Sequence, residues 1–213
     1  MINTSEQEEL LKLIANFMKT DIEAVAIGGT AMMFSNYKNA TKDIDIVFKD
    51  VEDRDVFIDA IKQLGYIEKS LSDIYDEKRQ QNPAKPLMFS RSDERFDLFV
   101  SSVFGFKINF SQDAVLQKYD FLGKSRLTLN VPVKEVLILL KAITGRETDF
   151  EDIVTILKAE NNVSWDSITK QAIGYKESLP WILIDLEECM QKLGKLFDID
   201  DTYFKRLYDA HGD

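Results

Sequence analysis

The 213-residue chain carries 27 basic and 37 acidic side chains, which gives a net charge of −10 near pH 7, and 45% of its residues are apolar. This length and composition predict one sizeable core, or an α/β domain with a helical appendage, and they argue against disorder. The acidity disfavours strong non-specific binding to nucleic acid, because phosphate neutralisation dominates that affinity.

The chain has a single cysteine, Cys189, and a single histidine, His211. An intrachain disulfide is therefore excluded, and neither a zinc site nor a nucleophile–histidine pair is expected. Any bound metal would have carboxylate ligands. No run of 18 apolar residues and no basic-then-apolar N-terminus occurs, so we expect no membrane span, no signal peptide and a cytoplasmic protein.

A glycine-rich turn follows a short apolar strand in the first quarter of the chain. Residues 25–27 predict the strand, and Gly28 and Gly29 predict the turn. Thr30 opens a short helix, residues 31–34, that ends near Ser35 and Asn36. Glycine lets the backbone turn sharply and approach a ligand, and the free N–H groups of a helix start attract an anion such as phosphate. The turn is predicted to be half of a phosphate site.

Two carboxylates project from the next predicted strand, residues 43–48. Alternation places Asp43 and Asp45 on one face, about 7 Å apart, and larger apolar side chains on the other. Such carboxylates repel each other unless one takes up a proton or a cation sits between them, and Mg²⁺ or Mn²⁺ suits the pair. Because the aspartates precede the apolar residues, phosphatases with an aspartate nucleophile and many sugar transferases are disfavoured.

A third aspartate lies in a predicted hairpin formed by residues 87–90 and 95–100. Asp97 stands alone among apolar neighbours, where a carboxylate is costly to desolvate without a cation or hydrogen-bond partner. If its strand lies beside that of Asp43, three carboxylates converge, as in two-metal sites. An exposed edge-strand aspartate is the alternative. The polar stretch 70–86 is expected to be a surface loop, with a lid or acceptor-binding arm as the other option.

Other elements complete the first 130 residues. Ser5 and Glu8 have the spacing of a capping box at the start of an amphipathic helix. A second helix is predicted over residues 53–64, a strand with an aromatic face over 104–110, and a short strand over 127–132.

This part of the chain resembles the active-site pattern of the DNA polymerase β-like nucleotidyltransferase superfamily. The resemblance lies in Gly28 to Ala31, the short helix that follows, and Thr41 to Asp45. The likeness is greatest to small prokaryotic proteins related to the toxin of the AbiE toxin–antitoxin systems. It implies an α/β (α+β) nucleotidyltransferase fold with a mixed β-sheet flanked by helices. The metal-binding and catalytic carboxylates that it implies are Asp43, Asp45 and Asp97, and the nucleotide-binding residues are Gly28, Gly29 and Thr30.

The C-terminal part reads as helical, so we expect a nucleotidyltransferase domain over residues 1–130 and a helical subdomain over 131–213. Lys141 and Asp149 resemble the later motifs of the AbiE-toxin-like group. That likeness implies that Lys141 contacts the triphosphate and that Asp149 positions the lysine, the nucleotide or the acceptor. Arg146 could add a phosphate contact. Otherwise Lys141 would reach out to solvent, and Asp149 would complement the helix dipole.

The predicted function is metal-dependent transfer of a nucleoside monophosphate from an NTP to an acceptor hydroxyl with release of pyrophosphate, and the AbiE likeness adds a toxin–antitoxin role. The acceptor stays open between an RNA end, a protein side chain and a small molecule. Residues 131–213 carry 10 basic and 16 acidic side chains, which disfavours a polynucleotide. The rival is a catalytically inactive protein of this fold that binds a nucleotide or a protein partner. A cation-dependent phosphatase or nuclease fits the glycine turn less well.

Overall fold

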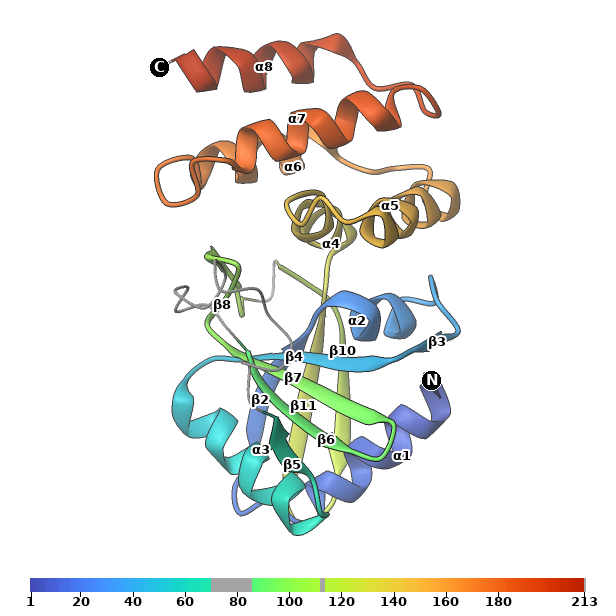
Figure 1. Cartoon of the computed structure of the whole chain (residues 1–213), viewed down its shortest axis with the longest axis vertical. Coiled ribbons are helices and arrows are strands. Elements are labelled where there is room, and N and C mark those ends of the chain that lie inside the picture. The colour runs from blue at the N-terminus through green and yellow to red at the C-terminus, as the bar shows by residue number, and fades with distance from the viewer. Residues whose placement is uncertain (70–85, 112–113, 213) are drawn as a thin grey trace. The chain divides into compact units, whose positions relative to one another are not determined.

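The computed structural model describes residues 1–69, 86–111 and 114–212, so all but the last residue of the predicted loop 70–86 lies outside the described residues. The chain forms two compact units, Met1–Pro132 and Val133–Asp213 (Figure 1). The expected architecture, a mixed sheet with flanking helices followed by further helices, is confirmed. Among the described helices, none is long and apolar enough to span a membrane.

A mixed sheet organises the first unit. Seven strands of the described chain form it, in the order β10-β11-β2-β4-β7-β6-β5, with β4 parallel to β7 and antiparallel to β2. The bounds of these strands are β2 Ile22–Ala26, β4 Asp43–Phe48, β5 Ile67–Lys69, β6 Leu87–Arg91, β7 Glu94–Val100, β10 Val115–Leu122 and β11 Arg126–Pro132. Two-residue strands form separate pairs, β1 Ile2–Asn3 with β3 Ala40–Thr41, and β8 Ser102–Val103 with β9 Phe106–Lys107.

The apolar side of β4 faces the core of this unit. Ile44, Ile46 and Phe48 are buried, and the Phe48 ring lies 5.3 Å from that of Phe57, which lies 5.4 Å from Phe96 of β7. Since side chains alternate along a strand, burial of this face fixes the aspartates of β4 on the opposite one. The helices of the unit are α1 Thr4–Ala15, α2 Gly28–Phe34 and α3 Val51–Gln63.

Two local predictions were wrong. The capping box uses Asn3 and Glu6, because asparagine also caps helices well and pairing of β1 with β3 holds Asn3 extended. No continuous strand covers 104–110, because Phe104 and Gly105 have φ of 52° and 88° and turn the chain between β8 and β9. Alternating aromatics were not sufficient evidence for a strand there.

The second unit is built from helices in the part that the structure describes. Ser164 caps one of them, because its hydroxyl accepts a hydrogen bond from the Ser167 N–H. Helix α4 packs against α5, α6 and α7, and α8 packs against α6 and α7. The bounds are α4 Lys134–Ala142, α5 Glu147–Ala159, α6 Trp165–Gly174, α7 Ile182–Leu193 and α8 Asp201–Gly212.

A glycine allows close approach between α1 and the turn after β10. A Cβ at Gly123 would lie 2.5 Å from the backbone carbon of Ala15 and 2.5 Å from the backbone nitrogen of Asn16. We expect Gly123→Ala to lower the free energy of unfolding by about 1–3 kcal/mol, because backbone cannot yield as a side chain can. Thermal unfolding followed by circular dichroism measures this.

Gly174→Ala is the matched control, because nothing lies within 4 Å of a Cβ at this helical position. Alanine favours a helix over glycine, so this variant is expected to be as stable as the wild type or slightly more stable. Equal unfolding temperatures for the two variants would contradict the close approach at Gly123.

Candidate functional site

Three carboxylates lie on adjacent positions of two neighbouring strands. Asp43 and Asp45 belong to β4, and Asp97 belongs to β7, where it is the direct partner of Asp45 in the parallel register. Parallel neighbours are roughly 4.8 Å apart, and residues two apart along one strand share a face. Asp43, Asp45 and Asp97, called the acidic cluster below, therefore share one face of the sheet, which is the arrangement expected if the two strands are neighbours.

The glycine turn is fastened to Asp45. The backbone N–H of Asp45 donates to the Thr30 hydroxyl at 3.0 Å, and the Asp45 carbonyl accepts from the Ile27 N–H at 3.1 Å. Gly28 has a φ of +54°, and a Cβ on it would lie 2.4 Å from the Asp45 carboxylate oxygen. Only glycine therefore combines this backbone turn with a carboxylate in this place.

Gly29 and Thr30, the next two residues, differ in their contacts and in their exposure to solvent. A Cβ on Gly29 would lie 2.2 Å from the Thr41 hydroxyl, so this glycine permits close contact with the segment before Asp43. Gly28 and Gly29 are partly exposed, whereas Thr30 is completely buried. The Thr30 hydroxyl accepts a hydrogen bond from the backbone of Asp45, and its contact with a nucleotide stays a prediction.

Sequence reasoning overlooked the arginine that accompanies these carboxylates. Arg95 is opposite Asp43 in the register, and its Nη2 lies 2.6 Å from Asp43 Oδ2. Its Nε lies 3.0 Å from Asp97 Oδ1. Asp97 is therefore not alone on its face, and the signal was present in the sequence, because residues 95 and 97 share a face of an alternating strand.

The donor set of the acidic cluster suits a hard divalent cation. Carboxylate oxygens are the ligands that Mg²⁺ and Mn²⁺ prefer, and Gly28 leaves room beside one of them. Among the described residues, no group of three His, Cys, Asp or Glu side chains is already arranged as a metal site. Arg95 places one positive charge among these carboxylates, whose oxygen donors fit a divalent cation.

The remaining predicted site residues meet in the second unit. The Lys141 ammonium lies 2.9 Å from Asp149 Oδ1 and 2.7 Å from Asp152 Oδ2, and all three residues are buried. Lys141 does not reach out to solvent, and it links α4 to α5. Asp152 was overlooked, although its position three residues after Asp149 places both on one face of α5.

Asp149 is held by more than the lysine. Its other oxygen accepts hydrogen bonds from the Thr144 hydroxyl at 2.6 Å and from Arg146 Nε at 2.5 Å. Burial favours a higher pKa for Asp149, but the charge of Lys141 and these hydrogen bonds outweigh it and lower the pKa below its ordinary value. Arg146 is mostly exposed, so of the predicted phosphate contacts in this unit it is the more accessible cation.

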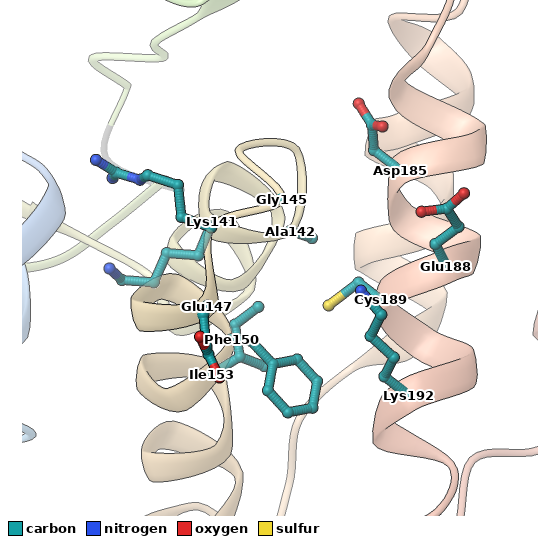
Figure 2. A pocket seen from close by; sticks show the side chains of 11 residues that line it. Lys141, Ala142, Gly145, Glu147, Phe150, Ile153, Asp185, Glu188, Cys189 and Lys192 are labelled. Carbon is teal, nitrogen blue, oxygen red and sulfur yellow. The ribbon is translucent and has the colours of Figure 1, made fainter.

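A cavity of about 360 Å³ lies beside Lys141, between α4, α5 and α7. Figure 2 shows the Cys189 thiol of α7 directed toward α5, Asp185 and Glu188 farther along α7, and the Lys141 ammonium pointing away from α7. Burial and the charge of Glu188 raise the pKa of Asp185, and burial raises that of Cys189 to about 11. Cys189 is therefore a neutral thiol near pH 7 and a poor nucleophile.

Comparisons with known proteins add a distant likeness. No family profile and no curated protein matches the chain. A crystal structure of ANT(2″)-Ia in complex with adenylyl-2″-tobramycin aligns at 12% identity with a TM-score of 0.37, covering 97% of both chains. A solution structure of the antibiotic-resistance factor ANT(2″)-Ia aligns at 12% identity and TM-score 0.32, covering 90% of this chain and 80% of that one. Neither is an AbiE-toxin-like protein. Identities and TM-scores this low do not assign a function to the chain.

Proposed function

We propose that the chain is a metal-dependent nucleotidyltransferase, which transfers a nucleoside monophosphate from an NTP to an acceptor hydroxyl. The observation that supports this most is the fastening of the Gly28 turn to Asp45, with Asp97 directly opposite. This arrangement joins a partly exposed glycine backbone, suited to phosphate, to carboxylates suited to the metal that accompanies nucleotides.

Each residue has a proposed task in the reaction. Asp43, Asp45 and Asp97 would hold Mg²⁺ or Mn²⁺, and Gly28 and Gly29 would let the triphosphate approach the backbone. The acceptor oxygen bonds to the α-phosphorus as the bond to the pyrophosphate oxygen breaks, and a cluster carboxylate takes the hydroxyl proton. When bound, the cation neutralises charge on the phosphates.

The residues of the second unit stay proposed contacts. Lys141 and Arg146 are the proposed cations for the triphosphate, with Asp149 positioning them. Lys141 would first have to leave two buried carboxylates, which makes Arg146 the stronger of the two proposals. The acceptor is proposed to be a small molecule, a protein side chain or an RNA end, with acidity against the last.

One observation favours the second candidate, a non-catalytic protein of this fold that binds a partner, such as a toxin–antitoxin component. Arg95 already places a positive charge between Asp43 and Asp97, which reduces their mutual repulsion without a metal. In that case neither nucleotide nor cation would change the stability of the chain.

Thermal unfolding with Mg²⁺ and each NTP in turn separates the two candidates. A ligand at about 100 times its dissociation constant stabilises a protein by ~2.7 kcal/mol, and a shift of a few degrees is expected for one or more NTPs. The shift should require Mg²⁺ and should vanish in the Asp43→Ala/Asp45→Ala double variant. The absence of any shift, with a double variant at least as stable as the wild type, would favour the non-catalytic protein.

A further inference from the structure

One guanidinium bridges two members of the acidic cluster. Arg95 Nη2 lies 2.6 Å from Asp43 Oδ2 and donates a hydrogen bond to Asp97 Oδ2 at 3.2 Å. Arg95 Nε lies 3.0 Å from Asp97 Oδ1, within ion-pair distance but without the alignment of a hydrogen bond. The arginine thus occupies the space between the side chains proposed to hold the cation.

Burial explains why this charge is present. Asp97 is only 6% exposed, and a buried carboxylate is costly without a compensating charge. The side chains of Asp43 and Arg95 are about one third exposed, at 31% and 34%. The Arg95 side chain is therefore more accessible to solvent than that of Asp97.

We propose that Arg95 is a displaceable counter-ion, and that a divalent cation binds Asp43 and Asp97 only in exchange for its guanidinium. This inference rests on the proposed function, which gives the reason for a cation at the acidic cluster. In both states a positive charge lies between Asp43 and Asp97 and reduces their mutual repulsion. Cation affinity is then set by competition with a positive charge carried on the chain itself.

The competition predicts both a change in cation affinity and a movement of the Arg95 guanidinium. If the guanidinium must leave, a neutral side chain at position 95 should make cation binding tighter. Loss of one positive charge would tighten cation binding even if Arg95 stayed in place, so the movement of the guanidinium has to be measured separately. Lysine keeps the charge, so Arg95→Lys should bind the cation as the wild type does.

The test is a titration of the nucleotide-free full chain with Mn²⁺, followed by the electron paramagnetic resonance signal of free Mn²⁺. Arg95→Gln is expected to bind at least tenfold more tightly than the wild type, which corresponds to about 1.4 kcal/mol. The matched control is Arg91→Gln, because Arg91 has a similarly exposed side chain, 38%, and pairs with Glu94 at 2.9 Å outside the acidic cluster. This control should bind Mn²⁺ like the wild type.

A second measurement uses the wild type and does not depend on the folding of a variant. Labelling with phenylglyoxal, mapped by mass spectrometry, should rise several-fold at Arg95 when Mn²⁺ is added, because the guanidinium leaves its carboxylates. Labelling of Arg91 should stay the same. Labelling of Arg95 that does not change while Mn²⁺ binds overturns the exchange.

The outcomes separate this inference from the proposed function. Wild-type Mn²⁺ binding that is lost in Asp45→Asn but unaltered or weakened in Arg95→Gln overturns the role of Arg95 and leaves the transferase proposal standing. If neither the wild type nor Arg95→Gln binds Mn²⁺, both proposals fail together. Tighter binding by Arg95→Gln, together with labelling of Arg95 that rises when Mn²⁺ binds to the wild type, supports the exchange.

Discussion

Asp45→Asn is expected to lower the affinity of the chain for Mn²⁺ or Mg²⁺ by more than about 100-fold, since loss of even an outer-shell partner of a metal ligand commonly costs 10- to 100-fold. Asparagine has nearly the same shape as aspartate and removes one charge. The hydrogen bond from the Asp45 backbone to Thr30 is retained, because it does not involve the side chain. The change therefore tests chemistry with little effect on the fold.

The measurements are the Mn²⁺ titration and the Mg²⁺-dependent rise in unfolding temperature with the active NTP. Without metal, the variant should be at least as stable as the wild type, because Asp45 and Asp97 are direct partners and like charges repel. Asp59→Asn is the control, since Asp59 lies on the surface of α3 in an ion pair with Lys19. Cation and nucleotide binding that survive in Asp45→Asn would contradict the proposed function.

The strand β4 was predictable because its apolar and acidic residues alternate. Alternation over residues 43–48 fixed both the strand and the face of its aspartates, and the structure places β4 at Asp43–Phe48. The turn before it was predictable because Gly28 and Gly29 allow conformations that other residues do not. In both elements the residues themselves determine the local backbone conformation.

Elements without an apolar face were harder to predict. Strand β10, Val115–Leu122, was not predicted, because most of its side chains are exposed and it belongs to the sheet through backbone pairing with β11. The predicted strand over residues 104–110 was wrong for the opposite reason. Its aromatics alternate, but positive φ angles at Ser101 and Phe104 bend the chain.

The sequence identified the residues of the candidate site, but not all the side chains that contact them. Sequence identified Asp97 as a carboxylate in need of compensation, and the structure supplies Arg95, two residues earlier on the same strand. Lys141 was expected to reach water in the absence of a ligand. Its burial depends on how α4 packs against α5, and that packing arises from contacts which no local pattern specifies.

Lys141→Met is expected to lower the free energy of unfolding of the second unit by about 3–5 kcal/mol, the range found when one partner of a buried ion pair is removed. Methionine preserves most of the buried volume, so the loss is electrostatic. It would leave Asp149 and Asp152 as buried carboxylates without the ammonium that contacts both.

Urea unfolding followed by tryptophan fluorescence measures this change in the right part of the chain, because both tryptophans, Trp165 and Trp181, belong to the second unit. Lys170→Met is the control, since Lys170 is mostly exposed and pairs with Asp166 at the surface. Its curve should nearly coincide with that of the wild type.

The effect of pH identifies the cause. Because the folded-state pKa of Asp149 is lowered, its ion pair contributes stability above the unfolded-state pKa of about 3.9 and loses it as pH falls through the folded-state value. In Lys141→Met the same carboxyl can escape its buried charge by taking up a proton. The difference in stability between the wild type and Lys141→Met should therefore shrink as pH falls from 7 toward the pKa of the unfolded carboxylates.

Removing all three charges tests whether uncompensated buried charge causes the loss of stability. The triple variant Lys141→Met/Asp149→Asn/Asp152→Asn leaves no uncompensated buried charge, so it should recover part of the stability lost in Lys141→Met. If the single variant is as stable as the wild type at pH 7, the ammonium is not what holds α4 to α5. Lys141 would then be free to leave its carboxylates, and its proposed contact with a triphosphate would gain support over that of Arg146.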